Sequence, residues 1–541
     1  MKNFDGTGRL VRLALRRDRF TLPAWVLGMS AFLAATTAMF QKQYGSHFAL
    51  LAADTRIVVE NPGMRVLGLV TGAHVGGYTL HRDALTLAVL AAMMSVLAVV
   101  RHTRQAEELG REEMLRAGVV GRYSSLAAAV TVTLAANLAL AVLLGLAMMI
   151  AGQPVTGSLA AGASIALVGV AFTGVAAVSA QLSSTTRGAT GLSGAALGVA
   201  FLLAALGNML GAVDSAALRV TSAWPAWLSP IGWGQQMRPF ADDLWWPLGF
   251  AMPATAVSFG VSIVLARRRD VGRGLLPERG GRAHASPALL SPAGLVRRQQ
   301  RTTLLGWVLG MLGFGLVFGT LSAQIKGLEG GATTWYDAFG GDAGLLNAYW
   351  ASMMQIAGMA VAVYAIALLL RLHHDEAGGT LEPVLGTAVS RLRWLGAYAG
   401  NALAGATLLL LVFATAMGLT GGQALGGTAS LLRDLLGAAL VQLPAVGVLG
   451  AAVVVLITSL PRWSVGLSWA LAVFAIFAGP MFGPSLDLPA WLLDLSPFTH
   501  LPDAPAEAVT AGPILGLGLV SALLAVAGVS RLRRRDLMLP A

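Results

Sequence analysis

The chain has 541 residues, of which 56% are hydrophobic and only 12% are charged, and its mean hydropathy is +0.70. About a quarter of the residues in a soluble domain are charged, so this composition excludes a water-soluble fold and indicates an integral membrane protein. The net charge of +11 comes almost entirely from arginines beside hydrophobic segments, which favours membrane orientation over nucleic-acid binding.

Hydrophobic runs long enough to cross about 30 Å of hydrocarbon predict twelve transmembrane helices, six in each half of the chain. In the first half they lie near residues 23–42, 84–100, 125–150, 158–180, 190–212 and 247–266. In the second half they lie near residues 304–323, 350–370, 395–419, 436–459, 464–483 and 511–530. The predicted fold class is therefore an all-α membrane protein with two pseudo-symmetric six-helix halves.

The second half repeats landmarks of the first half in the same order. The repeated sequences are Trp-Val-Leu-Gly-Met at 25–29 and 307–311, Pro-Ala-Trp-Leu at 225–228 and 489–492, and Arg-Arg-Arg-Asp at 267–270 and 533–536. Duplicated membrane units are typical of transporters, whose two halves face each other across a pathway.

Basic residues gather before the first predicted helix and after the second and sixth, whereas carboxylates gather in the alternate connections. Those carboxylates are Asp54, Glu60, Asp242, Asp243, Asp337, Asp342, Asp487, Asp494, Asp503 and Glu507. The positive-inside rule therefore places both termini in the cytoplasm. Residues 273–296 are predicted to be a cytoplasmic linker that joins the first half, 1–272, to the second half, 297–541.

The predicted helices contain almost no charged side chains. A charge at the bilayer centre costs about 2.5–3.5 kcal/mol and is usually retained for ion coupling, so its absence argues against proton-driven antiport. The alternative is that coupling carboxylates lie near helix ends, where Asp83 and Asp214 are the candidates.

The loops after the second helix of each half carry the strongest functional signal. Each has acidic residues, a glycine and the pattern Glu-x-x-Leu, at Glu112 with Leu115 and at Glu382 with Leu385. A short helix here would present a charged face and an apolar anchor to another protein. An ordinary solvated loop is the alternative, and recurrence in both halves favours docking.

With these loops on a duplicated six-helix unit, the chain resembles permeases of the type-2 class of ABC exporters. Its doubled, arginine-rich form looks like the actinobacterial tetronasin-resistance and multidrug efflux permeases. The resemblance implies the membrane subunit of an exporter in the bacterial plasma membrane, which moves hydrophobic or amphipathic compounds such as drugs, antibiotics or lipids out of the cell. It implies two copies of a separate ABC ATPase subunit, and ATP and Mg would bind in that partner, so no cofactor is expected in this chain.

The resemblance also implies cytoplasmic interfacial helices near residues 9–19 and 297–301, and short outer re-entrant helices before the last helix of each half. Pro383 replaces Glu113 of the first loop, so the second coupling helix is expected to be shorter. Coupling to the ATPase is expected from Glu108, Arg111, Glu112, Leu115, Arg116, Glu376, Thr380, Glu382 and Leu385. The substrate pathway is expected to include Met93, Met94, Phe201, Asn208, Met353, Met354, Gln355, Phe474 and Phe477, with ordinary helix packing as the alternative for at least half of them.

No catalytic, metal or nucleotide site is predicted. The chain has no cysteine and no Gly-x-x-x-x-Gly-Lys-(Ser/Thr) pattern, and the adjacent His373 and His374 would point apart on a helix. Two other functions remain open. A twelve-helix secondary carrier would need no ATPase and would depend on proton motive force. A membrane-bound transferase would have to draw its catalytic groups from Asp242, Asp243, Asp487 and Asp494.

Overall fold

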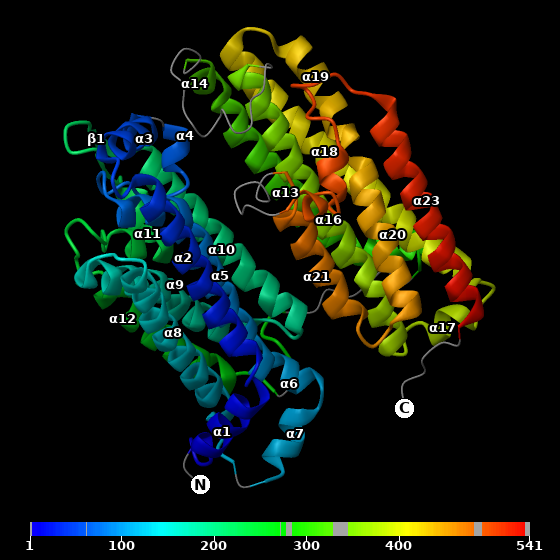
Figure 1. Cartoon of the computed structure of the whole chain (residues 1–541). Coiled ribbons are helices and arrows are strands. Elements are labelled where there is room, and N and C mark those ends of the chain that lie inside the picture. The colour runs from blue at the N-terminus through cyan, green and yellow to red at the C-terminus, as the bar shows by residue number, and fades with distance from the viewer. Residues whose placement is uncertain are drawn as a thin grey trace. The chain divides into compact units, whose positions relative to one another are not determined.

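The computed structural model describes residues 3–60, 62–118, 120–270, 272–276, 284–327, 344–480 and 489–535. The chain divides into two compact units, Met1–Gly280 and Gly281–Ala541 (Figure 1). Part of the predicted linker lies outside the described residues, and so do Asp337, Asp342, Asp487 and Asp536.

The first unit is a helical bundle built around α9. Its long helices are α2 (Thr21–Tyr44), α5 (Val75–His102), α8 (Ser124–Ile150), α9 (Val155–Leu182), α10 (Thr186–Met209) and α12 (Leu248–Arg267). α9 packs against α5, α8 and α12, and small residues allow the close approach. A Cβ atom on Gly162 would lie 2.0 Å from the carbonyl oxygen of Ala141 on α8, as expected where membrane helices touch through small residues.

Short elements cover the two ends of this bundle. One end carries α3 (Phe48–Glu60), α4 (Pro62–Arg65) and the antiparallel strands β1 (Ala212–Asp214) and β2 (Arg219–Thr221), while α1 (Thr7–Arg17), α6 (Arg104–Glu108) and α7 (Arg111–Arg116) lie at the other (Figure 1). The amphipathic α1 packs on α8 through its buried Leu10 and Ala14. A separate amphipathic helix therefore forms where the first interfacial helix is expected, and its position at the membrane surface stays a prediction.

The tryptophan-rich segment before α12 folds back into the bundle as η1 (Trp224–Leu228) and α11 (Pro230–Gln235). The Ser229 hydroxyl begins α11 by accepting from the amide of Ile231, and it donates to the carbonyl oxygen of Ala200 on α10 at 2.6 Å. Trp227 stacks on Trp246 with ring centroids 5.2 Å apart. The segment is thus both a short inserted helix and an aromatic cluster.

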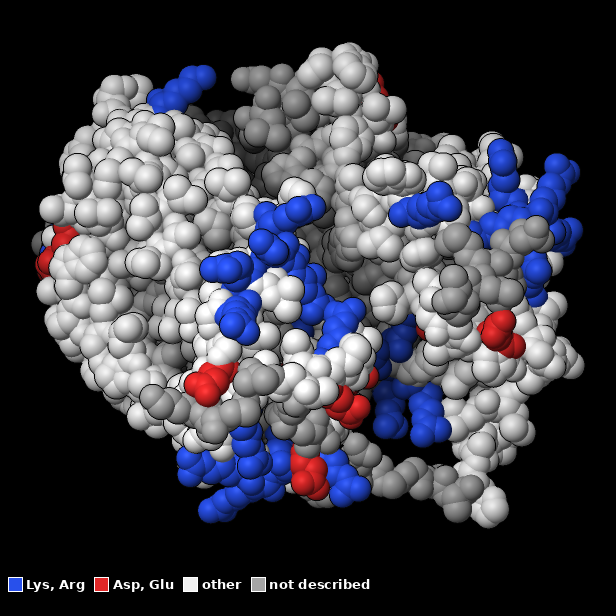
Figure 2. Space-filling view, turned by 90° about the horizontal axis from the view of Figure 1, so that it is seen from below, with Lys and Arg blue, Asp and Glu red and all other residues white. Residues whose placement is uncertain are grey.

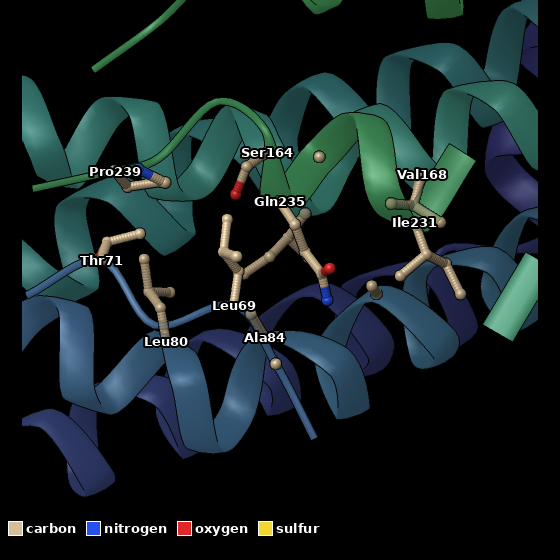
Figure 3. A pocket seen from close by; sticks show the side chains of 13 residues that line it. Leu69, Thr71, Leu80, Ala84, Ser164, Val168, Ile231, Gln235 and Pro239 are labelled. Atoms are coloured by element: carbon tan, nitrogen blue, oxygen red, sulfur yellow. The ribbon is translucent and has the colours of Figure 1, made fainter. Parts of the chain in front are cut away.

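A cavity of about 30 Å³ lies between α11, α5 and α9. Figure 3 shows Gln235 reaching from α11 towards the helix that carries Leu80 and Ala84, with Ser164 nearby. This volume holds about two water molecules and is about a tenth of what a small-molecule site needs.

The second unit contains the helices of the second half. They are η2 (Pro287–Leu290), α13 (Pro292–Thr320), α14 (Ser322–Gly327), α16 (Leu345–Ala377), α17 (Glu382–Leu385), α18 (Arg391–Leu425), α19 (Thr428–Val441), α20 (Leu443–Ser459), α21 (Ser464–Phe477), α22 (Ala490–Leu493), η5 (Pro497–His500) and α23 (Ala511–Arg534). Its core joins α16, α18, α19 and α20.

Eleven helices of the described chain are long and apolar enough to cross a membrane. The eleventh predicted helix, 464–483, is described only as α21, whose 14 residues span about 21 Å at 1.5 Å per residue and fall short of about 30 Å of hydrocarbon. The all-α membrane class is confirmed, eleven full-length spans lie within the described residues, and the arrangement of twelve helices in two halves stays a prediction.

Two predicted helix starts were wrong. α5 begins at Val75 rather than near residue 84, because the His74 ring caps it by accepting from the amide of Gly77, and the helix therefore contains the buried Asp83. α13 begins at Pro292, so residues 297–301 form its first turns instead of a separate interfacial helix. Ser291 caps α13 and no helix-breaking residue follows before the hydrophobic run.

Candidate functional site

The loop between α5 and α8 is tied to the rest of the first unit by a buried carboxylate. Both oxygens of Glu107 accept from Arg269 just beyond α12, at 2.6 and 2.9 Å, and Arg104 donates to the same carboxylate at 2.8 Å. Arg104 also donates to the carbonyl oxygen of Ala180 at the end of α9, at 3.0 Å. We call Glu107, Arg104 and Arg269 the first clamp.

The second unit builds the same connection. Arg535, just beyond α23, donates to the carboxylate of Glu376 at the end of α16 and to the carbonyl oxygen of Ile457 on α20 at 3.1 Å. Arg391 at the start of α18 donates to the carbonyl oxygen of Arg535 at 2.8 Å. We call Glu376 and Arg535 the second clamp. In each unit, a clamp joins the loop region after the second long helix to the end of the last helix.

Sequence reasoning did not identify the clamps. In the sequence, Arg269 and Arg535 stand out only as parts of the repeated Arg-Arg-Arg-Asp sequence. Each is the third arginine of its copy. Glu376 was expected on a docking face, but it is 3% exposed and pairs with Arg535. The repeat itself was the available signal, because two short arginine runs in equivalent positions suggest equivalent partners.

The expected coupling carboxylates of the first loop point into their own unit. Glu112 is 4% exposed and accepts from the Ser125 hydroxyl at 3.1 Å. Glu108 accepts from the amide of Thr186 at 2.8 Å, which caps α10. Glu112 is therefore buried and the exposed Glu108 is hydrogen-bonded within the unit, so both groups hold the loop in place, and a coupling role for either stays a prediction.

Other side chains of the loops are open to solvent. In the first loop Arg111 is exposed, Leu109 and Met114 are 53% and 70% exposed, and Leu115 is half-buried. The side chain of Arg116 lies outside the described residues. In the second loop, Thr380 and Glu382 are exposed, and Leu385 packs at the edge of the core. α17 has 4 residues against 6 in α7, so the second coupling helix is shorter, as Pro383 predicted. A role for either loop in coupling stays a prediction.

An ion pair also fixes the junction of α1 and α2. Asp18 is almost fully buried, and its two carboxylate oxygens lie 2.7 Å from Arg101 and 2.5 Å from the His102 ring, both at the end of α5. Burial acts to raise the pKa of Asp18, but the hydrogen bond to His102 and the charges of His102 and Arg101 outweigh it and hold the pKa below its ordinary value.

Most of the expected pathway residues pack inside their own unit. Met94, Met353 and Met354 are buried in apolar clusters. Asn208 donates to the Gln235 side chain at 2.9 Å and accepts from Ser222 at 2.7 Å, so its amide is already engaged.

Gln355 donates to the carboxylate of Asp503. Burial and then the nearby Glu507 raise the pKa of Asp503. Met93 and Phe477 are exposed, and Phe201 and Phe474 are half-buried. These four side chains are accessible at the surfaces of their units, and a pathway through them stays a prediction.

One cavity of the first unit has a volume slightly below that of the smallest small-molecule sites. It has a volume of about 270 Å³ and lies among α2, α5 and α10, where Trp25, Met94, Leu97, Arg101 and Thr190 line it. Among the expected pathway residues only Met94 borders this cavity. We call it the α2–α10 cavity. Within the described ranges, no cluster of three or more His, Asp or Glu residues could hold a metal ion.

Comparisons with known proteins agree with a transport role. Residues 289–533 match the family model described as the C-terminal domain of the multidrug efflux system permease Rv1217c. The whole chain is similar to the multidrug efflux system permease protein Rv1217c of Mycobacterium tuberculosis (strain ATCC 25618 / H37Rv). The two are 37% identical over 538 residues, which cover 98% of this chain and 95% of the relative.

Proposed function

The chain belongs to the multidrug efflux system permeases, and from this premise we propose that it is the membrane subunit of an ATP-driven ABC exporter that binds two copies of a separate ATPase subunit. The observation that carries the proposal is the clamp built in each unit. Equivalent clamps lie at the base of both loops. This arrangement suits a protein on which two identical partner subunits act, one at each loop.

The clamps suggest how such input would be passed on. An ATPase subunit that moved the loop containing α6 and α7 would also pull on Arg269 and hence on the end of α12, because the bidentate ion pair leaves little freedom between them. The same subunit type on the second loop would act on α23 through Glu376 and Arg535. ATP-driven closure would thereby move the last helix of each unit.

The charge distribution supports a cytoplasmic position for these loops. Figure 2 shows the view from below, with many Lys and Arg side chains over a face where few acidic ones appear. The exposed arginines of α1 include Arg9, Arg12 and Arg16. By the positive-inside rule this end, and both termini with it, would lie in the cytoplasm.

The proposed substrate is a hydrophobic or amphipathic compound that enters the α2–α10 cavity. Trp25, Leu97 and Met94 provide apolar contact, and the lining also contains polar side chains, among them Asp18, Arg101 and Thr190. Such a lining is typical of small-molecule sites, in which apolar walls supply contact area and a few polar groups set orientation.

The ATPase partnership can be tested by co-expressing the tagged chain with a candidate ABC ATPase from the same genome. We expect purification in mild detergent to yield two ATPase subunits for each copy of this chain, as measured by native mass spectrometry. An untagged chain expressed with a tagged ATPase should give the same ratio. A chain that exports drugs in cells from which that ATPase gene has been deleted, and that recovers no ATPase, would contradict the proposal.

The substrate assignment predicts a size-dependent effect of filling the α2–α10 cavity. Thr190→Trp fills the cavity from α10 and should reduce efflux of large compounds at least about tenfold, a loss of about 1.4 kcal/mol in binding, while small compounds are less affected.

The matched control for this experiment is Thr131→Trp, on an exposed position of α8. Efflux of a series of compounds of increasing size is measured in cells that contain equal amounts of each variant. An equal loss for all sizes in Thr190→Trp would show damage to packing and would remove the assignment of this cavity.

A further inference from the structure

A second cavity lies on the other side of the α1–α2 junction. The proposed transport of a drug gives this cavity no role. It has a volume of about 320 Å³ and lies among α1, α7 and α8, at the low end of the range for small-molecule sites. His102 lines this cavity, whereas its partner Asp18 lines the α2–α10 cavity together with Arg101. Asp18 pairs with both His102 and Arg101, so this buried cluster lies between the two cavities.

The walls of this cavity combine an apolar surface with two free cations. Leu13, Ala14 and Ala129 give the apolar surface, and Arg17 and Arg111 give the charge. Among the residues that the structure describes, neither arginine has a carboxylate within ion-pairing distance. Burial, and then the charges of Arg111 and Arg101, lower the pKa of Arg17, and Asp18 opposes them only weakly because it is the smallest of the four contributions.

The carboxylates near the cavity are already engaged elsewhere. Asp18 is held by Arg101 and His102. Glu112 is not part of the lining, and it accepts from Ser125 on α8. An anion entering the cavity would therefore meet two arginines with unsatisfied donors and no free acid on the lining.

The position of α1 indicates where such an anion would come from. Leu13, Leu15 and Phe20 are exposed beside the exposed Arg16 and Arg19, a pattern typical of helices that lie in the headgroup region of a bilayer. The amino-terminal segment holds α1 to the loop before α8, because the amide of Gly121 donates to the carbonyl oxygen of Asp5 at 2.8 Å. A lipid beside α1 could reach the cavity with its headgroup while its chains remain in the bilayer.

We propose that the cavity among α1, α7 and α8 binds the headgroup of an anionic phospholipid, with the phosphate held by Arg17 and Arg111 and the acyl chains beside the apolar side of α1. Basic pockets between membrane helices bind such headgroups in other membrane proteins. A volume of about 320 Å³ suits a headgroup with its glycerol rather than a whole lipid. The lipid would brace α1 against α7, and the site does not depend on the ATPase.

The test compares three additives on the purified full-length chain in detergent: a short-chain phosphatidylglycerol, a phosphatidylcholine of the same chain length, and inorganic phosphate. We expect phosphatidylglycerol to raise the melting temperature at concentrations at least tenfold lower than phosphatidylcholine, and phosphate to have little effect. Arg17→Gln should weaken the phosphatidylglycerol effect at least tenfold, and Arg17→Lys should restore part of it. Arg16→Gln removes an exposed arginine of α1 that does not line the cavity and should behave as the unmodified chain does.

Three results would overturn the proposal. They are an unchanged phosphatidylglycerol effect in Arg17→Gln, an equal effect of inorganic phosphate, and an equal loss in Arg16→Gln, which would indicate a diffuse charge effect. If Arg17→Gln does not fold, the unmodified chain can be labelled with a photoactivatable phosphatidylglycerol. Labels on peptides of α1 and α8 would then support the site, and labels confined to other helices would overturn it.

Discussion

Arg269→Ala is expected to lower the free energy of unfolding of the first unit by about 1.5–3 kcal/mol, the usual contribution of a hydrogen bond to a charged group. The change leaves Glu107 with one cationic partner instead of two, and it also removes the hydrogen bond from Arg269 to Gln181, at 2.7 Å. Efflux should be lost as well, because the loop would no longer be tied to the end of α12. The measurement is thermal unfolding in detergent together with drug efflux at equal expression.

The neighbouring arginine provides a matched control. Arg268 is exposed, so Arg268→Ala should change stability by no more than about 0.5 kcal/mol. Arg535→Ala and Arg534→Ala make the same comparison in the second unit, where Arg535 is paired and Arg534 is exposed. Equal unfolding of the two variants of either pair would show that the clamp does not stabilise its unit.

Met114→Asp is expected to abolish most substrate-stimulated ATP hydrolysis while the chain still inserts and folds. Met114 is 70% exposed at the tip of the first loop, so a carboxylate there costs the isolated chain little. Against a partner it would place a charge where an apolar anchor is expected, and loss of a central interface contact costs about 2 kcal/mol or more. We therefore expect at least about a thirtyfold weaker interaction with the ATPase, measured by titration of the purified subunits.

Val213→Asp is the control for this prediction, because Val213 is an exposed apolar residue on β1 at the opposite end of the unit. Glu382→Lys tests the second loop in the same way, since Glu382 is exposed. Glu112→Lys is expected to destabilise the first unit instead, because Glu112 is buried against Ser125. Full ATP hydrolysis in the combined Met114→Asp and Glu382→Lys variant would contradict the docking assignment.

The membrane class and most helix positions could be predicted from the sequence because a spanning helix is a local property. A run of about twenty apolar residues satisfies its backbone within itself, so hydropathy alone identifies α8, α9 and α18. Hydropathy predicted the helix start wrongly where polar residues belong to the helix, as at Asp83 in α5 and at residues 297–301 in α13. Hydropathy also overestimated the length of α21, because an apolar run does not show at which residue a helix ends.

The clamps could not be predicted because they depend on the tertiary fold. Glu107 and Arg269 are 162 residues apart, and Glu376 and Arg535 are 159 apart. The sequence around an acidic residue does not show whether its side chain is exposed or paired within its own unit. Glu382 is exposed, whereas Glu376 pairs with Arg535. The burial of Glu112 could not be predicted for the same reason, since only the packed position of α8 brings Ser125 to it.

The proposal that ATP drives export can be tested most directly in inside-out membrane vesicles that contain this chain and its ATPase. Accumulation of a fluorescent drug is measured with ATP and a protonophore, and separately with an imposed proton gradient and no nucleotide. The account predicts ATP-dependent accumulation that survives the protonophore and disappears in Arg269→Ala but not in Arg268→Ala. Accumulation driven by the proton gradient alone, and unaffected by ATP, would contradict it and would identify a secondary carrier.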